Sequence, residues 1–368
     1  MPIRKEGKEL FHEQLHSILL DQIREGTLAP GQKIPSEREL SELYSVSRTT
    51  AKAAVLRLHS DGLVVRATGK GTFIADDVND RRLASVRTGN IGLVVNKRRS
   101  YRVPLTEDAV YLALSQSVHS EVLKNGMHMM TAVVDDEDVQ ESKSYKNLLE
   151  KVDGVIVAEA RSMALGDLAR ARKRPVVYVS PSDSHAGFDT VDIDNEHAGA
   201  LATRYVLTLG HRAVGFIRGP SAIGSALSRL HGYMTAIEEA GLELHEQWIA
   251  DADGWTVDDG ARAARMLIAQ AKELTAVVCS NDLLALGAMR AFRALGRDVP
   301  AAVSIIGCDN IELGQHSDPA LTTLDTHIYS IGRVATQRLV QRMEGDDGPP
   351  QRILFPVSVV ERETCAAF

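Results

Sequence analysis

The chain has 368 residues, of which 44% are hydrophobic and 25% charged, a composition typical of a folded protein with two or three domains. No run approaches ~18 apolar residues, which excludes a transmembrane helix. The first residues also lack the apolar stretch of a secretory signal. Three cysteines without metal-like spacing are typical of reduced thiols, so we expect a cytoplasmic protein without a metal site.

The charge is distributed unevenly along the chain. The net charge of -7, taken alone, argues against a nucleic-acid partner. The first 89 residues nevertheless carry 14 Lys+Arg against 12 Asp+Glu, whereas the remaining 279 carry 28 against 37. Between Leu43 and Ala75 there are five basic residues and one acidic residue. The chain therefore combines a basic N-terminal segment with an acidic remainder, and the proposed function must account for this uneven charge.

Helical patterns occupy the first part of the chain. Apolar residues recur at helical spacing from Leu10 to Ile23. Ser36, followed three residues later by Glu39, forms a capping box and therefore starts a short second helix. We expect this helix to bury Leu40 and Leu43.

A third helix is predicted from Arg48 to His59, one tight turn after the second. Ser47 caps it, and its inner face consists of Ala51, Ala54, Val55 and Leu58. Its leading end leaves four polar side chains outside, namely Arg48, Thr49, Thr50 and Lys52. Two helices joined by so short a turn, the second with such a leading end, suit a recognition helix in a major groove of DNA.

A hairpin follows the third helix. The segments LVVRA and TFIA read as strands on either side of a glycine-rich tip that contains Gly69, Lys70 and Gly71. Such a wing can bring its backbone and Lys70 to a phosphate or a minor groove. A side chain in place of Gly69 or Gly71 would obstruct that approach.

The segment from Phe11 to Ala75 resembles the winged helix-turn-helix of the GntR family. The resemblance combines PSER, VSRTT, an L-x-x-x-G-L exit and a G-x-G-T-F wing. It implies DNA contacts by Arg38, Arg48, Thr49, Thr50, Lys52, Gly69 and Lys70. Many members have arginine where this chain has Lys52, which keeps the charge but loses the bidentate fork for guanine. Arg57 and Arg66 are interpreted as solvated surface charges.

A polar stretch without convincing periodicity follows the wing. We predict a DNA-binding domain over residues 1–76, a linker over 77–89 and a second domain over 90–368. Within the linker, Arg81 and Arg82 are interpreted as a solvated pair rather than as contacts to DNA flanks.

From Asn90 onward short apolar runs alternate with amphipathic helices, which predicts an α/β fold with parallel sheets in two lobes. Predicted strands cover 91–95, 127–134, 154–158, 176–179, 213–217, 276–280 and 303–308, and predicted helices cover 198–209, 229–240, 260–271 and 283–295. Ligands of such folds bind beyond the carboxyl ends of the strands. Polar residues stand at those ends, namely Asn96, Glu159, Ser180, Asn281, Asp282, Asp309 and Asn310.

This second part, from Asn90 to about Arg362, resembles the LacI-type sensor, which is related to periplasmic sugar-binding proteins. The resemblance is carried by six segments in order, VDIDNEHAG (191–199), LGHRAVGFIRGP (209–220), SALSRLHGY (225–233), CSNDLLALGAMRAFRALGRDVP (279–300), VSIIGCDN (303–310) and PALTTL (319–324).

The resemblance implies a set of effector-binding residues in a cleft between the lobes. Arg229 and Asp309 would each form paired hydrogen bonds to adjacent sugar hydroxyls. Asn281 would face the ligand, while its neighbour Asp282 would cap the following helix. Trp255 would stack on an apolar sugar face, with a partly buried rim position as the alternative. The full predicted set is Asn96, Glu159, Arg229, Trp255, Asn281 and Asp309.

Some features depart from a simple sugar site. Ala158 and Ser180 stand where other polar or acidic side chains are expected. Residues 97–102 include four bases, which form a solvated lid or favour an anionic effector such as a sugar phosphate or sugar acid. Glu159 and Asp309 would oppose such an anion. The acidic run at 135–138 is interpreted as a solvated loop, and no metal or cofactor fingerprint is present.

Together the two resemblances are those of the arabinose-repressor group. They imply a homodimeric transcription regulator, a repressor, which binds double-stranded operator DNA and a small carbohydrate-like effector and has no contact with a membrane. A periplasmic-type sugar-binding protein is an alternative, but it would need a signal peptide and no winged domain. No enzymatic activity is expected, because no cofactor lysine or nucleophile–base set is found, although His185, Asp189 and Cys308 are tempting candidates.

Overall fold

A computed structural model of the chain describes residues 11–24, 26–67, 69–78, 88–96, 109–134, 139, 141–160, 162–181, 187–221 and 223–368, without the side chains of residues 24 and 96. The chain divides into two compact units, Met1–Thr88 and Gly89–Phe368. Among the described helices, none is long and apolar enough to cross a lipid bilayer.

The first unit is a three-helix winged fold. Its elements are α1 (Phe11–Arg24), α2 (Glu37–Leu43), α3 (Arg48–Ser60), β1 (Val64–Ala67) and β2 (Gly71–Ile74). The strands pair antiparallel, with Val64 opposite Ile74 and Ala67 opposite Gly71. The inner faces of the helices close on a core that includes Leu15, Leu19, Leu40, Ala54, Leu58 and Ile74. This core and hairpin have the order of elements that the sequence predicts.

The prediction that α2 buries Leu43 is wrong. Leu40 is fully buried, but Leu43 is 66% exposed. The helix ends at Leu43, and the next residue, Tyr44, packs against the core instead. Gln22 of α1 donates a hydrogen bond to the Tyr44 hydroxyl at 3.3 Å, which holds this aromatic ring in place.

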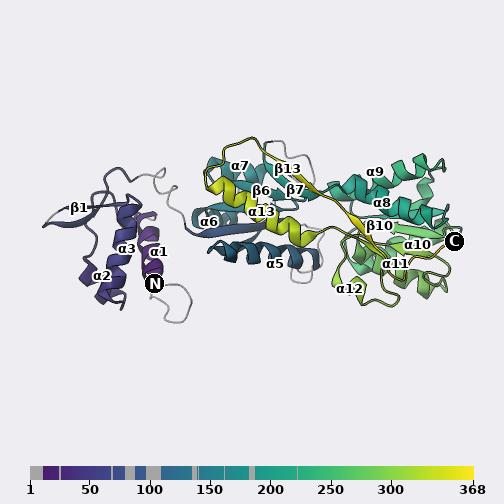
Figure 1. Ribbon diagram of the computed structural model, residues 1–368, viewed down its shortest axis with the longest axis horizontal. Coiled ribbons are helices and arrows are strands. Elements are labelled where there is room, and N and C mark those ends of the chain that lie inside the picture. Colours follow the sequence, from purple (N-terminus) through teal and green to yellow (C-terminus); the bar gives the residue numbers. More distant parts are fainter. Residues whose placement is uncertain are drawn as a thin grey trace. The chain divides into compact units, whose positions relative to one another are not determined.

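The second unit has two lobes, each built on a parallel sheet (Figure 1). The sheet of lobe 1 has the order β13-β7-β6-β5-β3-β4. Its strands are β3 (Asn90–Asn96), β4 (His128–Val134), β5 (Gly154–Ala158), β6 (Val176–Val179), β7 (Asp189–Ile193) and β13 (Arg352–Phe355). Its helices are α5 (Ala109–Lys124), α6 (Lys143–Lys151), α7 (Ala164–Ala171) and α13 (Ile328–Met343). The buried clusters place α5 and α13 on one face of the sheet and α6 and α7 on the other.

Lobe 2 has a smaller sheet with the order β11-β10-β8-β9. Its strands are β8 (Val214–Arg218), β9 (Ile249–Asp251), β10 (Ala276–Cys279) and β11 (Ser304–Ile306). Its helical segments are α8 (Asn195–Thr208), α9 (Gly224–Glu239), η2 (Glu246–Trp248), α10 (Val257–Gln270), α11 (Asp282–Ala294) and α12 (Glu312–Gln315). Helices α8 and α9 cover one face, whereas α10 and α11 cover the other.

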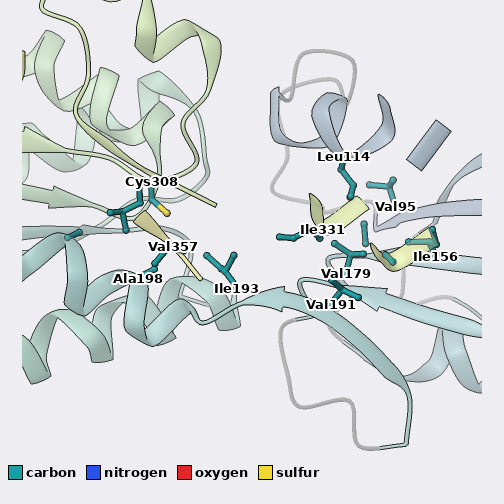
Figure 2. Close-up of a cluster of buried hydrophobic side chains, with 14 of the residues drawn as sticks. Val95, Leu114, Ile156, Val179, Val191, Ile193, Ala198, Cys308, Ile331 and Val357 are labelled. Atoms are coloured by element: carbon teal, nitrogen blue, oxygen red, sulfur yellow. The ribbon is translucent and has the colours of Figure 1, made fainter. Parts of the chain in front are cut away.

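Three chain segments cross between the lobes, where β7 leads to α8, β12 (Thr323–Asp325) leads to α13, and β13 leads to β14 (Ser358–Val360). β12 and β14 pair antiparallel beside the crossing. One buried apolar cluster continues through it, and Figure 2 shows Ile193 between Val191 of lobe 1 and Ala198 of lobe 2. The crossing segments therefore form a hinge with a shared core.

Candidate functional site

The leading end of α3 presents polar side chains to the outside. The backbone N–H of Thr50 donates to Ser47 Oγ at 3.1 Å, and the hydroxyls of Thr49 and Thr50 lie 2.7 and 2.8 Å from the same oxygen. This cap holds the first turn of the helix. Arg48, Thr49 and Lys52 are exposed, and Thr50 is partly buried. The four predicted residues are thus grouped on one helix end.

The other predicted DNA-binding residues lie on α2 and at the tip of the wing. Arg38 is exposed and pairs with Glu42 at 3.0 Å. Gly69 and Lys70 are exposed in the tip. Gly69 has φ +75 and open space where a Cβ would stand, so within the protein its lack of a side chain serves the turn rather than a close contact.

Two surface ion pairs brace this unit. Arg66 of β1 lies 3.1 Å from Glu37 of α2, which ties the wing to the second helix. Arg57 of α3 lies 3.8 Å from Glu13 of α1. Each of these side chains is 40% exposed or more, so the pairs agree with the interpretation of Arg57 and Arg66 as solvated charges.

Arg229 of α9 is the centre of a buried polar cluster at the hinge. Its Nε donates to Asn195 Oδ1 at 3.0 Å, and its Nη1 donates to the backbone carbonyl of Ser280. Its Nη2 lies 3.7 Å from the carboxylate of Asp309, and both side chains are only 11% exposed. The guanidinium is therefore held from the start of α8, the end of β10 and the loop after β11.

The cluster continues into lobe 1 through Asp192, at the end of β7, which the sequence analysis missed. Its carboxylate accepts hydrogen bonds from Ser180 Oγ at 3.0 Å, the backbone N–H of Ile193 at 2.8 Å and Asn195 Nδ2 at 3.3 Å. Burial raises the pKa of Asp192 to about 6, although these donors and the charge of Arg229 oppose the rise. Its position at a strand end, inside the segment VDIDNEHAG, was the available signal.

The prediction that Asp282 caps α11 is wrong, because Asn281 is the cap and Asp282 is bonded within the fold. Asn281 has the extended backbone of a cap residue, and its Oδ1 accepts the N–H of Leu284 at 2.9 Å. Asp282 is fully buried and accepts hydrogen bonds from the N–H of Ile311 at 2.9 Å and from the Thr323 hydroxyl. Burial raises the pKa of Asp282 to about 6.

The remaining predicted effector residues lie at other strand ends. Glu159 follows β5 with φ +56 and lines a pocket of about 30 Å³ together with Ser180 and Tyr111. Trp255 packs over the end of β8, where a Cβ on Gly219 would lie 2.2 Å from its ring. Its indole nitrogen is buried and, among described residues, has no hydrogen-bond partner.

Several predictions fall outside the described residues. These are the Asn96 side chain, the basic segment at 97–102, the acidic run at 135–138, Arg81, Arg82 and His185. In the part of the chain that the structure describes, no group of His, Cys, Asp and Glu is arranged to hold a metal ion.

Two family models match different parts of the chain. The model of bacterial regulatory proteins of the gntR family matches residues 11–74, and a periplasmic binding protein-like domain matches residues 203–365. The chain joins a GntR-family DNA-binding domain to a periplasmic-binding-protein-like domain. The predicted pair of domain families and the predicted α/β architecture are therefore confirmed.

Known relatives of this two-domain protein are regulators. It is 29% identical over 317 residues to the HTH-type transcriptional repressor PurR of Escherichia coli O1:K1 / APEC, an alignment that covers 82% of this chain and 92% of the relative. Among solved structures it resembles the transcriptional regulator CelR–cellobiose complex, with 25% identity and a TM-score of 0.69 over 90% of this chain and 100% of that one. It also resembles the lac repressor dimer bound to operator and the anti-inducer ONPF, with 24% identity and a TM-score of 0.68 over 79% and 99%.

These comparisons decide the class of function. The matching gntR-family model describes bacterial regulatory proteins, and the relative PurR is a transcriptional repressor, so the comparisons support the predicted class of a DNA-binding transcription regulator. The alternative of a sugar-binding protein without a regulatory role is not supported.

The raised pKa of Asp192 predicts a pH-dependent stability. The folded chain holds a proton at Asp192 up to about pH 6, whereas an unfolded aspartate loses it near 3.8, so this stabilising contribution is present at low pH and lost as the pH rises through 6. Asp192→Asn should therefore gain roughly 1.4 kcal/mol of stability relative to the wild type between pH 5 and pH 7, because pH 5 lies about one unit below the folded pKa of about 6. Urea unfolding at both pH values measures the change. The exposed residue Asp194, replaced by asparagine, is the control, and an equal difference at both pH values for Asp192→Asn would contradict the prediction.

Proposed function

We propose that the protein is a dimeric repressor whose binding to operator DNA is controlled by a carbohydrate-like effector between the two sensor lobes. The observation that carries this proposal is the buried polar cluster around Arg229 at the hinge, in a chain that also has an exposed recognition helix. The names of similar proteins support it, since one is a repressor and another is a regulator in complex with cellobiose.

The cluster has the chemistry to bind hydroxyl groups. Arg229 offers donors and Asp309 offers acceptors, so together they can engage adjacent hydroxyls of one sugar. The Nδ2 group of Asn281 adds a donor. Because Arg229 and Asp309 are only 11% exposed, a bound hydroxyl would be shielded from competing water. We assign Asn96, Glu159 and Trp255 to the rim of the same site.

A movement of the lobes can be transmitted to the DNA-binding unit through the segment that connects it to β3 of lobe 1. The N–H of Gly89, one residue before β3, donates to Asp153 Oδ2 at 2.8 Å, which ties the incoming chain to the turn between α6 and β5. We propose a DNA-binding domain over 1–76, a linker over 77–89 and the sensor over 90–368. A typical coupling of ~1–3 kcal/mol between the sites would change operator affinity roughly 5–150-fold.

Operator binding is tested through Arg48, one of the proposed DNA contacts with Arg38, Thr49, Thr50, Lys52, Gly69 and Lys70. Arg48→Ala should weaken binding roughly 10–100-fold, because a bidentate arginine–base contact is worth ~1–3 kcal/mol. Fluorescence anisotropy at fixed salt measures the affinity for a duplex that the wild type has selected from a random-sequence library.

Arg57→Ala is the matched control for this experiment, because Arg57 lies near the other end of the same helix and pairs with Glu13. We expect it to bind the selected duplex within about 2-fold of the wild type. Failure of the wild type to enrich any sequence, or equal binding by Arg48→Ala, would refute the DNA-binding assignment.

A further inference from the structure

Several carboxylates lie around the Arg229 guanidinium of the hinge cluster. Asp309 lies 3.7 Å from Arg229, and Asp192 and Asp282 are close enough to interact with it electrostatically. Glu159 follows β5, another strand of lobe 1, and lines a pocket together with Ser180. Asp282 already accepts hydrogen bonds from Ile311 and Thr323, so its carboxylate is used within the fold.

Asp192 belongs to lobe 1, whereas Asp309 and Asp282 belong to lobe 2. Its Oδ1 accepts two short hydrogen bonds, from Ser180 and from the backbone of Ile193, which fix its orientation. Among the described residues, the hydrogen-bond donor to the Oδ2 of Asp192 is Asn195 at 3.3 Å, and a carboxylate oxygen can accept a further donor. The side chain is partly exposed, whereas its neighbours Val191 and Ile193 are buried.

Asn195 connects this carboxylate to the other lobe. Its Nδ2 donates to Asp192, and its Oδ1 accepts from Arg229 Nε at 3.0 Å. A continuous polar chain therefore runs from Ser180 and Asp192 of lobe 1 to Arg229 and Asp309 of lobe 2. Acceptors face the hinge from both lobes, and among the described residues Arg229 is the cation that is hydrogen-bonded into this chain. Arg352 and Arg362 also act on the carboxylates of Asp192 and Asp282, respectively, through their charge.

We propose that Asp192 is a further effector-binding residue and that the effector is an uncharged polyhydroxylated compound. The inference rests on the proposed function and narrows its ligand class. One hydroxyl donates to Asp192 on lobe 1, and neighbouring hydroxyls bind Arg229 and Asp309 on lobe 2. A phosphate or carboxylate in the same place would meet Asp192 and Asp309 with like charge, and Arg229 is already paired with Asp309.

Calorimetry with matched ligands tests this inference on the full chain. The panel pairs glucose with glucose 6-phosphate and glucuronate, and ribose with ribose 5-phosphate, and it includes cellobiose. We expect at least one neutral compound of the panel to bind. Its anionic counterpart should bind at least about 10-fold more weakly or not at all. Asp192→Asn should weaken binding of the neutral ligand about 10–100-fold, since a hydrogen bond to a charged acceptor is lost.

Two further variants complete the experiment. Asp194→Asn, two residues along the chain at an exposed helix cap, should bind as the wild type does. Ser180→Ala removes the hydroxyl that orients Asp192 and should weaken binding about 3–10-fold. Operator binding shows whether Asp192→Asn is folded. If that variant does not fold, Ser180→Ala provides the decisive comparison.

The outcomes separate the inference from the proposed function. If only an anionic member of the panel binds, the inference is overturned and the proposed function stands. If Asp192→Asn and Ser180→Ala bind the neutral ligand as tightly as the wild type, the role of Asp192 is overturned. If no member of either class binds, the proposed effector site itself fails, and the inference fails with it.

Discussion

Arg229→Ala is expected to abolish effector binding while leaving operator binding intact. The substitution removes the donors to Asn195 and Ser280 and the partner of Asp309. The carboxylates of Asp192 and Asp309 would then face the hinge without the cation between them. Truncating one partner of a buried, hydrogen-bonded charge contact in a binding interface costs ~2–5 kcal/mol, so we expect effector affinity to fall by about 30-fold or more.

The result is measured by calorimetry with the sugar that the wild type binds and by operator titration with and without that sugar. The variant should stay on the operator at sugar concentrations that release the wild type. Arg229→Lys keeps the charge but not the paired donors of the guanidinium. Its affinity for the sugar should therefore lie between those of the wild type and Arg229→Ala. Arg204→Ala removes a surface ion pair between α8 and α9 and is the control. Wild-type affinity in Arg229→Ala would contradict the assignment of the cluster as the effector site.

Most strands were predictable because they are runs of buried apolar residues. GVIVA and VVYV became β5 and β6 with the predicted bounds, and all of their residues are buried. β7 escaped prediction because DTVDI contains two acids. Asp189 is only 3% exposed because Arg338 and Arg342 of α13 donate to it at 2.9 and 2.6 Å. These arginines lie some 150 residues away in the sequence, so no local pattern reveals that the acid can be buried.

Two predicted residues of the candidate site lie in segments that resemble the LacI-type sensor and come from the same lobe. These residues are Arg229 and Asp309, and the structure places the Arg229 guanidinium 3.7 Å from the Asp309 carboxylate. Asp192 and Asn195 lie in a recognised segment as well, but their role depends on hydrogen bonds to Ser180 and Arg229, which come from different lobes. Only the crossing of the chain at the hinge brings these groups together.

Helix α8 packs against α9 through two glycines, and this contact sets the position of Arg229. A Cβ on Gly199 would lie 1.9 Å from the backbone oxygen of Arg229, and one on Gly232 would lie 1.9 Å from the backbone oxygen of Glu196. Gly199→Ala would therefore force the two helices apart. We expect a loss of about 3 kcal/mol or more in the free energy of unfolding, with weaker effector binding because Arg229 moves with its backbone.

The sign of the change in the free energy of unfolding caused by Gly199→Ala distinguishes helix packing from intrinsic helix propensity. Within a helix, alanine is favoured over glycine by ~0.5–1 kcal/mol, so propensity alone predicts that Gly199→Ala stabilises the protein. Urea unfolding monitored by circular dichroism measures the net change. Gly241→Ala is the control, because a Cβ there meets open space and only the φ of +68 opposes it, at a cost of about 1–2 kcal/mol. A Gly199→Ala chain as stable as the wild type would show that α8 and α9 separate without strain, and the glycine contact would then not be what positions Arg229.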